Sequence, residues 1–440
     1  MKKILLIQPS PYDQNGQPIK KNKLYFVGLA LPLLAAMTPE EYEVEIILEI
    51  IEDIPWDTDA DIIGISTMGH GVIRSIDIAK TFKENGKTVI LGGYMASIME
   101  EEATKYCDAV VVGDAELVWG DLLKDYEQGN LKQIYEKNLT EGILSTPLPR
   151  FDLILDKKLG DFLPVQAGRG CPNVCSFCSV ACLYEGHYIK KPLEEVIRDI
   201  KHIKSLGYRK FLLLDDNIFS DRKYLGELLK EIKALNMKWM SQCDIRIGRE
   251  DDLLKELKKS GCTTLSFGIE SISRESLIGM NKGWANPAEY PQLIKNIQDH
   301  GIDVSTEMVV GGDGDTVESI KATKDFIEDN KISVPRFYIL TPIPGTKFFK
   351  DIVKQNRLIK DDIYSFDGTE AVHKPQNMTP EELTKAYWDL YNSLFTYKSI
   401  IKRNILRKEF LREPFKYIFY FGVNLYYRYQ IKQKITPNIF

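Results

Sequence analysis

Three closely spaced cysteines have the clearest chemical meaning in this sequence. Cys171, Cys175 and Cys178 lie within eight residues in the order C-x3-C-x2-C, directly after a β-like run at residues 162–166. A loop this short can direct three thiolates at one centre, and thiolates are the ligands that iron–sulfur clusters select. A cluster with three protein ligands leaves one iron open, so the spacing predicts a reaction site.

A fourth cysteine leaves a second interpretation open. Cys182 follows Cys178 by four residues, so four cysteines together could form a zinc knot or a closed cluster. Zinc sites usually pair two C-x2-4-C units across a longer spacer, and this sequence has no second unit of that kind. We therefore interpret Cys182 as a loop residue near the cluster.

The cysteine spacing resembles the signature of the radical S-adenosylmethionine (SAM) superfamily, in which an aromatic residue, here Phe177, precedes the third cysteine. The resemblance implies that Cys171, Cys175 and Cys178 bind a [4Fe-4S] cluster, with Phe177 beside the cofactors. The open iron would bind the amino and carboxylate groups of SAM. An external electron donor, such as a flavodoxin or ferredoxin, would reduce the cluster, and SAM would release a 5′-deoxyadenosyl radical.

Length and composition limit the class of protein. A chain of 440 residues is long enough for two or three domains. It is 44% hydrophobic and 28% charged, which argues against disorder, and its net charge of −5 indicates no nucleic-acid partner. Its seven cysteines form no evenly spaced disulfide framework, and the apolar run near the start is too short for a signal peptide. We therefore expect a cytoplasmic protein.

Residues 1–135 are predicted to form an α/β domain of the Rossmann-like, or flavodoxin-like, type. Short runs rich in valine and isoleucine alternate there with amphipathic stretches, such as residues 71–83 and 97–106. This alternation is typical of a doubly wound parallel sheet, whose ligands lie beyond the carboxyl ends of the strands. The predicted strands are residues 4–7, 43–48, 62–66, 88–91 and 109–112.

Together with the cysteine motif, this domain resembles the cobalamin-binding domain of one large radical SAM subfamily. The resemblance rests on the opening ILLIQPSP and on the strands that end IGIS, LGG and VVGDAE. It implies that a group of small and polar residues lines the slot for the nucleotide tail of cobalamin. This group is Ser66, Thr67, Gly92 and Gly93, with Gly113 and Glu116 close to it.

The sequence departs from the usual cobalamin motif at one point. In D-x-H-x-x-G domains the histidine binds cobalt from below, but residues 9–23 contain no histidine here. Cobalamin would then bind with its lower face free or touched by another group. His70 is the only histidine of this domain, and two roles stay open for it: a contact near the corrin, or a hydrogen bond within its loop.

The next segments read as a linker and a barrel. Residues 136–160 include Pro147 and Pro149, which fix an extended path. Residues 161–345 alternate strands and helices, and with the strand before the cysteines they predict six units, a partial (β/α)6 TIM barrel. The further strands are predicted at residues 210–214, 238–242, 264–267, 303–310 and 334–340, and the helices at 193–205, 223–234, 250–260 and 286–299.

Polar residues follow several of these strands, at the end where chemistry gathers in such barrels. Acidic and hydroxyl groups suit the ammonium, the ribose hydroxyls and the sulfonium of SAM. By resemblance, the contacts are Asp215, Asp216 and Asn217 for the amino group, Ser241 and Asp244 for the ribose, and Glu270 near the adenosine. The alternative is that such a side chain only caps the next helix, an option that also applies to Asp221.

Residues 346–440 are predicted to be helical, with Pro380 at a helix start after Thr379. The tail at residues 395–440 carries a charge of +8, against −13 for the remainder, and is rich in aromatic residues. Its apolar run is too short to span a membrane. Two interpretations stay open: a helical cap packed on the barrel, or an amphipathic segment on an anionic membrane surface.

The sequence thus favours a cobalamin-dependent radical SAM enzyme, by resemblance a methyltransferase that acts on an unactivated carbon. The motifs PGT, Asp367-Gly368 and MTPEEL in the C-terminal region resemble a branch with hopanoid methylases, which implies a hydrophobic, lipid-like substrate. One alternative is an enzyme with both cofactors that performs cyclisation, rearrangement or carbon–carbon coupling. Another is an iron–sulfur binding or regulatory protein without SAM chemistry.

Overall fold

The computed structural model describes residues 2–13, 15–67, 69–137, 144–360, 366 and 368–437. The chain divides into two compact units. Unit 1 comprises the described residues of Met1–Gly170 and Cys182–Tyr208, and unit 2 those of Cys171–Ala181 and Arg209–Ile439. The domain boundaries expected from the sequence, at residues 135, 160 and 345, stay predictions.

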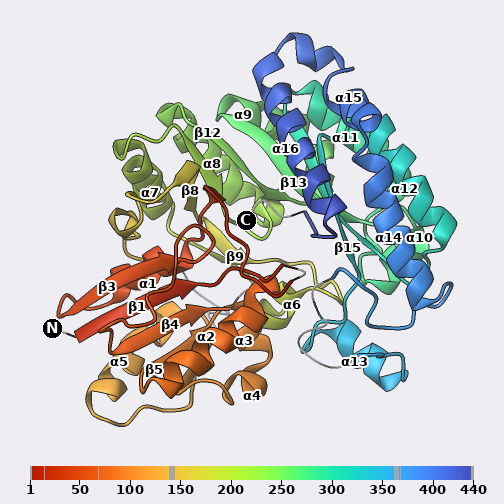
Figure 1. Cartoon of the computed structure of the whole chain (residues 1–440). Coiled ribbons are helices and arrows are strands. Elements are labelled where there is room, and N and C mark those ends of the chain that lie inside the picture. The colour runs from red at the N-terminus through yellow and green to blue at the C-terminus, as the bar shows by residue number, and fades with distance from the viewer. Residues whose placement is uncertain are drawn as a thin grey trace. The chain divides into compact units, whose positions relative to one another are not determined.

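Unit 1 is built on a parallel sheet of six strands in the order β3-β1-β4-β5-β6-β7. Buried aliphatic residues of its strands, such as Leu5, Ile63 and Val89, pack against Ile78 and Phe82 of helix α2. Helix α2 lies beside β4 and β5 of this sheet (Figure 1). The strands are β1 (Lys2–Gln8), β3 (Tyr42–Leu48), β4 (Ile62–Ser66), β5 (Thr88–Gly92), β6 (Ala109–Gly113) and β7 (Ile134–Lys137). The helices are α1 (Ala30–Met37), α2 (Val72–Glu84), α3 (Tyr94–Ile98), α4 (Glu100–Ala103) and α5 (Trp119–Glu127).

Unit 1 also holds two short strand pairs and a helix beyond this sheet. Strand β2 (Leu24–Phe26) pairs in parallel with β8 (Leu159–Val165), which leads toward the cysteines. Strands β9 (Gly168–Gly170) and β10 (Tyr188–Lys190) form an antiparallel pair on either side of the cysteine motif. Helix α7 (Leu193–Ser205) follows, and α6 (Ser179–Tyr184) begins in unit 2 and ends in unit 1.

Unit 2 contains five parallel strands in the order β15-β14-β13-β12-β11. They alternate with helices, as the barrel pattern of the sequence predicts (Figure 1). The strands are β11 (Lys210–Leu213), β12 (Lys238–Cys243), β13 (Cys262–Glu270), β14 (Asp303–Val310) and β15 (Val334–Ile339). The helices among them are α8 (Arg222–Leu235), α9 (Asp251–Lys259), α10 (Arg274–Gly279), α11 (Tyr290–Asp299) and α12 (Val317–Asp329).

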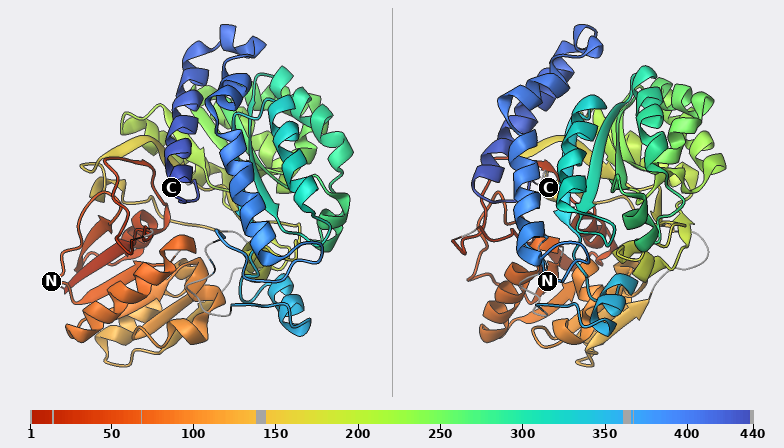
Figure 2. Two further views of the ribbon diagram at one scale, coloured as in Figure 1. Left: turned by 45° about the vertical axis from the view of Figure 1, so that its right-hand side comes forward. Right: turned by 90° about the vertical axis from the view of Figure 1, so that its right-hand side faces the viewer.

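The C-terminal region of unit 2 is helical, as expected. Its helices are α13 (Lys347–Lys354), α14 (Pro380–Leu394), α15 (Tyr397–Asn404) and α16 (Pro414–Lys432). Both views of Figure 2 show α14 and α16, in blue, side by side, and the two helices contact each other. Among the described residues, no helix is long and apolar enough to cross a membrane.

Most elements lie where the sequence predicts them, with one clear correction. The amphipathic stretch at residues 97–106 is not one helix, because the backbone of Met99 (φ −132°, ψ 44°) leaves the helical region and separates α3 from α4. Strand β2 was not expected either, since three residues are too few for a periodic pattern to stand out.

Candidate functional site

The cysteine loop, residues 171–178, belongs to unit 2 and is anchored there by backbone hydrogen bonds. The Ser176 N–H donates to the carbonyl of Met280 (2.9 Å), and the Phe348 N–H donates to the carbonyl of Ser176 (2.7 Å). The Asn281 side chain donates to the carbonyl of Val174 (2.7 Å). The loop is therefore held in the middle by residues that follow α10 and begin α13.

Phe177 packs against an apolar cluster beside this loop. The buried members of the cluster are Met280, Leu340, Phe348 and Ile352. Its ring therefore supports the loop, and the predicted contact of Phe177 with a cofactor stays a prediction.

The three cysteines supply a donor set that fits an iron–sulfur cluster. Cys175 is buried and the other two are half-buried, and burial raises the pKa of all three thiols, to about 11 for Cys175. Iron replaces the thiol proton, so cluster assembly releases protons. No three His, Cys, Asp or Glu side chains in the described ranges converge on a single ion. Cluster cysteines each bind a different iron, so they do not meet at one point.

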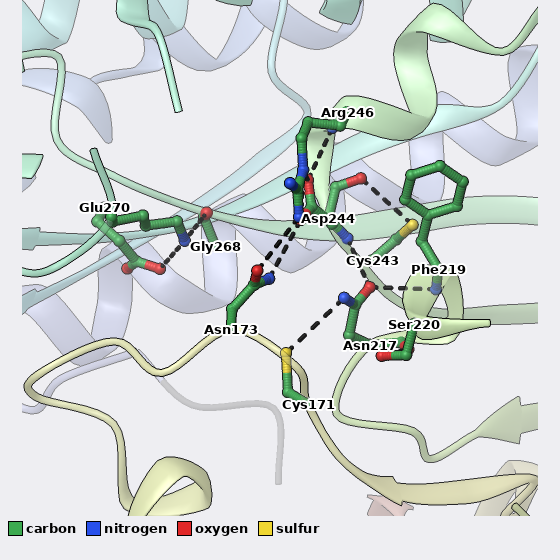
Figure 3. A network of polar contacts seen from close by, with 11 residues as sticks. Cys171, Asn173, Asn217, Phe219, Ser220, Cys243, Asp244, Arg246, Gly268 and Glu270 are labelled. Carbon is green, nitrogen blue, oxygen red and sulfur yellow. Dashed lines mark hydrogen bonds and ion pairs between the residues drawn. The ribbon is translucent and has the colours of Figure 1, made fainter. Parts of the chain in front are cut away.

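Polar side chains at two strand ends of unit 2 connect directly to the cysteine loop (Figure 3). The Asn217 amide lies 3.8 Å from the Cys171 sulfur, and its oxygen accepts hydrogen bonds from the N–H groups of Phe219 and Asp244. Asn173 of the loop donates to the Asp244 carboxylate (3.2 Å). Arg246 pairs with Asp244 and also donates to Asn173 (3.2 Å), so the loop and the β11 and β12 ends form one network.

A buried ion pair lies at the end of β13. The Lys282 ammonium donates to the Glu270 carboxylate (2.7 Å) and to the Gly268 carbonyl (2.6 Å). Burial is the largest single influence on the pKa of Lys282 and lowers it, but the charges of Glu270 and Cys175 and the hydrogen bond to Glu270 together outweigh burial, so the pKa lies above its ordinary value. Glu270 has a φ of +63°, which aims its side chain back along the strand end toward Gly268. The centre of the Trp284 ring lies 4.0 Å from the Arg246 guanidinium and 5.3 Å from the Lys282 ammonium.

Other predicted SAM contacts are used within the fold. The Ser241 hydroxyl donates to the carbonyl of Leu213 (2.7 Å). Asp244 caps the short helical turn that follows it, and Asp221 caps α8, the alternative considered for strand-end carboxylates. Asp215 is buried and Asp216 is half-buried, directly after β11. Their contacts with SAM stay predictions.

Four of the predicted cobalamin residues meet at the carboxyl ends of β4 and β5 in unit 1. The Thr67 hydroxyl donates to the carbonyl of Gly92 (2.8 Å) and accepts from the N–H of Ala96 (3.0 Å). Gly93 has a φ of +97°, and a Cβ there would lie 2.7 Å from the Thr67 carbonyl and 3.4 Å from the Ser66 hydroxyl. Only glycine fits such a position, so the two loops are locked together.

The other residues predicted to lie near cobalamin have different environments. They are Gly113, Glu116 and His70. The Gly113 N–H donates to the Ser97 hydroxyl (2.9 Å), which in turn donates to the Gly93 carbonyl (2.9 Å). Glu116 forms a buried ion pair with Arg169. His70 lies in a short helical turn, Gly69–Gly71, and its side chain is outside the described part of the structure.

Sequence reasoning did not identify Asn173, Arg246, Lys282 or Trp284 as part of this network. Asn173 stands inside the cysteine motif, so its position could have been noted. Lys282 and Trp284 follow α10 without a motif, and only the fold brings them to the end of β13.

The fold and the loop define a site of the radical SAM type, and comparison with known proteins agrees. Residues 165–327 match the model of the radical SAM superfamily. Bacteriochlorophyllide d C-12(1)-methyltransferase of Chlorobaculum tepidum is 28% identical, covering 91% of this chain and 89% of the relative. Hopanoid C-2 methylase of Rhodopseudomonas palustris is 24% identical, covering 79% of this chain and 68% of the relative.

A solved structure has the same fold. The radical SAM methyltransferase TsrM from Kitasatospora setae, solved with cobalamin and a [4Fe-4S] cluster bound, has a TM-score of 0.65 at 17% identity. The match covers 88% of this chain and 85% of that chain. Residues 165–327 therefore form a radical SAM domain. The predicted fold class, with its Rossmann-like sheet, partial barrel and helical C-terminal region, is confirmed.

Proposed function

We propose that this protein is a cobalamin-dependent radical SAM methyltransferase that methylates an unactivated carbon of a hydrophobic substrate. The observation that carries the proposal is the hydrogen-bonded network that joins the three-cysteine loop to the polar ends of β11 and β12. The methyltransferases among its relatives cover most of the chain, which supports methyl transfer over the other radical reactions.

The chain's residues have distinct roles in this proposal. Cys171, Cys175 and Cys178 hold the cluster, and Asn217 donates to the Cys171 sulfur, which stabilises negative charge there. A [4Fe-4S] cluster with one open iron supplies the binding site for SAM and the electron that cleaves it. Asp215, Asp216 and Asn217 would bind the SAM amino group, and Glu270, held by Lys282, would contact the adenosine.

The sheet of unit 1 provides the cobalamin site. Ser66, Gly92, Gly93 and Gly113 present backbone and a small hydroxyl at the carboxyl ends of β4, β5 and β6, where doubly wound sheets bind their ligands. Cobalamin supplies the methyl group that is transferred. Thr67 is a positioning residue, because its hydroxyl holds the Gly92 and Ala96 backbone in place.

The relatives indicate the class of substrate. Their names specify bacteriochlorophyllide d and a hopanoid, two large and largely apolar molecules. We infer that the substrate here is also a hydrophobic small molecule, and that the enzyme works in the cytoplasm with an external one-electron donor.

An anaerobic assay tests the reaction. The reconstituted protein is incubated with dithionite, SAM and hydroxocobalamin, and bound corrin and 5′-deoxyadenosine are measured by optical spectroscopy and mass spectrometry. We expect both. The C171A, C175A and C178A variants should each lose the cluster and 5′-deoxyadenosine formation. C182A should retain both, and its loss of the cluster would instead support a fourth protein ligand.

Product mass separates the proposed reaction from its alternatives. With methyl-deuterated SAM and an extract of membrane lipids and pigments as substrate, methyl transfer adds one labelled methyl group to a product. A product without the label would indicate cyclisation, rearrangement or coupling. Formation of 5′-deoxyadenosine without retained cobalamin would remove the methyl-transfer proposal, and no 5′-deoxyadenosine at all would favour an iron–sulfur protein without SAM chemistry.

Helix α16 has an exposed surface that suits contact with a membrane, from which a hydrophobic substrate would come. One face is fixed to unit 2: Tyr417 donates to Asp303 (2.8 Å), Tyr420 bonds Thr264 (2.7 Å), and Asn424 donates to the Ser333 carbonyl (2.9 Å). The opposite face carries exposed apolar side chains at helical spacing. This α16 stripe consists of Phe415, Ile418, Phe419, Tyr426 and Tyr429, of which Phe415 is 86% exposed.

We infer that the α16 stripe contacts an anionic membrane surface. Exposed cations flank the stripe, with Lys408 and Arg412 before it and Lys432 at its end, within a tail of charge +8. Aromatic rings beside cations match the apolar boundary and the charged headgroups of such a surface. Both interpretations of the tail thus have a basis in α16, because its inner aromatics pack on the strands and its outer ones are exposed.

Vesicle cosedimentation tests this contact with vesicles of phosphatidylcholine alone or mixed with phosphatidylserine. We expect much stronger binding to the anionic vesicles than to phosphatidylcholine alone, and an F415S/F419S variant should reduce it by about tenfold or more. The control variant V353S/I359S alters two exposed apolar residues elsewhere in unit 2 and should bind normally. Equal binding by both variants, or a dimer in solution that F415S/F419S disrupts, would overturn the membrane assignment.

A further inference from the structure

The segment that carries the cysteines leaves and returns through one stem in unit 1. Strands β9 and β10 pair Gly170 with Tyr188, Arg169 with Ile189 and Gly168 with Lys190. A further backbone bond, from the Lys191 N–H to the Ala167 carbonyl (2.8 Å), extends this pairing. Residues 171–187 therefore form a loop that is closed by a two-stranded stem. The position of the stem determines where that loop begins and ends.

The stem is packed closely around its two glycines, and Gly170 must be glycine. A Cβ on Gly170, whose φ is +81°, would lie 2.2 Å from the His187 carbonyl oxygen. A Cβ on Gly168 would lie 2.5 Å from the Tyr188 hydroxyl and 2.6 Å from its ring. Such contacts leave the stem little freedom to shift internally, so whatever holds the stem holds both of its strands.

Arg169, between these glycines, ties the stem to the end of strand β6. Its guanidinium donates to Asp114 (2.7 Å) and binds Glu116 through two nitrogens, while Nε donates to Gln166 (2.9 Å). All three charged side chains are largely buried, with exposed fractions of 14% for Arg169, 3% for Asp114 and 9% for Glu116. The planar guanidinium fork gives this contact a fixed direction that a single ammonium would not provide.

The other end of the segment reaches the same carboxylate. Tyr184, the last residue of α6, donates its hydroxyl to Asp114 (2.8 Å), and the His187 ring bonds the Tyr184 carbonyl (2.8 Å). Burial alone would raise the pKa of Glu116, but the charge and hydrogen bonds of Arg169, with smaller contributions from a backbone hydrogen bond and Lys191, together outweigh burial, and the pKa lies below its ordinary value. Glu116 is therefore ionised beside Arg169 at neutral pH.

We propose that Arg169 is a positioning residue that anchors the stem of the cysteine segment to the end of β6 through Asp114 and Glu116. The inference rests on the proposed function only in taking the segment as the carrier of the cluster. A guanidinium that is 14% exposed and paired with two buried carboxylates is not an ordinary surface arginine. In this role Arg169 acts through the stem and does not touch a cofactor.

Hydrogen exchange and electron paramagnetic resonance (EPR) test the anchor in the full-length protein. The variants are R169Q, R169K and, as a matched control, R150Q, which removes an exposed arginine–aspartate pair in the same unit. In R169Q we expect the amides of residues 168–190 to exchange about tenfold faster or more. After reconstitution we also expect a broadened or shifted EPR signal of the reduced cluster, at unchanged iron content because every cysteine remains. R169K should fall between R169Q and wild type, and R150Q should match wild type.

Two results would overturn the anchor. One is exchange at residues 168–190 and an EPR signal in R169Q that match wild type. The other is a lower melting temperature in R169Q with unchanged exchange and EPR in the folded protein, which would make Arg169 a contributor to stability alone. If R169Q does not fold, D114N takes its place, because it weakens the anchor and the Tyr184 contact but keeps the Glu116 pair. Absence of 5′-deoxyadenosine in wild type would contradict the proposed function, while the exchange data would still judge the anchor.

Discussion

At the scale of single residues, the Glu270–Lys282 ion pair beside the cysteine loop is the contact in which each partner most needs the other. Both side chains are buried, and the ammonium also satisfies the Gly268 carbonyl. A buried charge without its partner is costly, because water no longer solvates it. The pair therefore fixes Glu270 in its unusual backbone conformation at the end of β13.

Removing the cation should be strongly destabilising. We expect K282M to lower the free energy of unfolding by about 3–5 kcal/mol, because Glu270 is left buried and unpaired. Urea denaturation measures the change. The double variant K282M/E270Q should lose less than K282M, since it leaves no buried charge. K295M, which breaks the exposed Lys295–Asp299 pair of α11, should cost at most about 1 kcal/mol. Equal losses in K282M and K295M would contradict a buried, coupled pair.

A buried histidine gives stability a dependence on pH. His373 is fully buried, and burial, reinforced by Arg357 and opposed by Asp313, lowers its pKa to about 4. The unfolded chain, with a histidine pKa near 6.5, binds more protons between those two values, so stability falls as pH drops through that window. His373 should cost wild type roughly 3 kcal/mol of its free energy of unfolding across this window, and H373L should not show this loss. The measurement is the pH dependence of the difference in the free energy of unfolding between variant and wild type. A difference that does not change with pH would contradict it.

The cysteines could be identified from the sequence, but most of their neighbours could not. Three thiols at C-x3-C-x2-C spacing predict a cluster directly, since the whole motif fits in one short loop. Lys282 and Arg246 instead reach the network from separate elements, and a sequence without a fold gives no distance between them. Thr67 and Ser241 were predicted as cofactor contacts, and their hydroxyls also hold backbone in place.

At the scale of elements, the sequence predicted the start of helix α14 most clearly. Thr379 and Glu382 form a reciprocal capping box: the Thr379 hydroxyl accepts from the Glu382 N–H (3.1 Å), and the Glu382 carboxylate accepts from the Thr379 N–H (2.8 Å). Pro380 occupies the first helical position, where its missing N–H has no cost. These local signals explain why the helix start at Pro380 could be predicted.

Loss of this cap should weaken α14 locally. We expect T379A to lower the free energy of unfolding by about 1 kcal/mol, and to speed exchange of amides in the first turn of α14. Urea denaturation and hydrogen exchange report the two effects. K385A, on the same helix, removes only an exposed pair with Asp389 and should cost no more than about 0.5 kcal/mol. A larger effect for K385A than for T379A would argue against the cap.

The strands were predictable for a different reason. Strands β1, β4, β5 and β6 contain runs of valine, isoleucine and leucine that are buried on both faces, a pattern typical of a parallel sheet covered on both sides. Strand β7 has four residues, of which only Tyr135 is buried, and β2 has three residues, so neither carries a periodic signal. The break between α3 and α4 at Met99 lies inside an amphipathic pattern that continues across it, which is why periodicity alone missed it.

At the scale of the whole molecule, charge is unevenly distributed along the chain. Residues 395–440 carry +8 while the remainder carries −13. A net negative protein is repelled by an anionic membrane, so only an orientation that presents the basic tail can bind one. The distribution of charge thus selects α16 as the approaching face, and the exposed rings of the α16 stripe then determine how firmly it stays.

The separate roles of the basic residues and of the α16 stripe predict that vesicle binding responds to salt in two parts. Raising salt from about 0.1 M to about 1 M shortens the screening length from about 10 Å to about 3 Å, so attraction through Lys408, Arg412 and Lys432 should weaken and binding should fall. Apolar burial is not screened, so wild type should keep residual binding at high salt. F415S/F419S should lose this residual binding at high salt but keep the salt-dependent part of vesicle binding at low salt. Cosedimentation across a salt series measures both, and salt-independent binding of wild type would show that the basic residues do not take part.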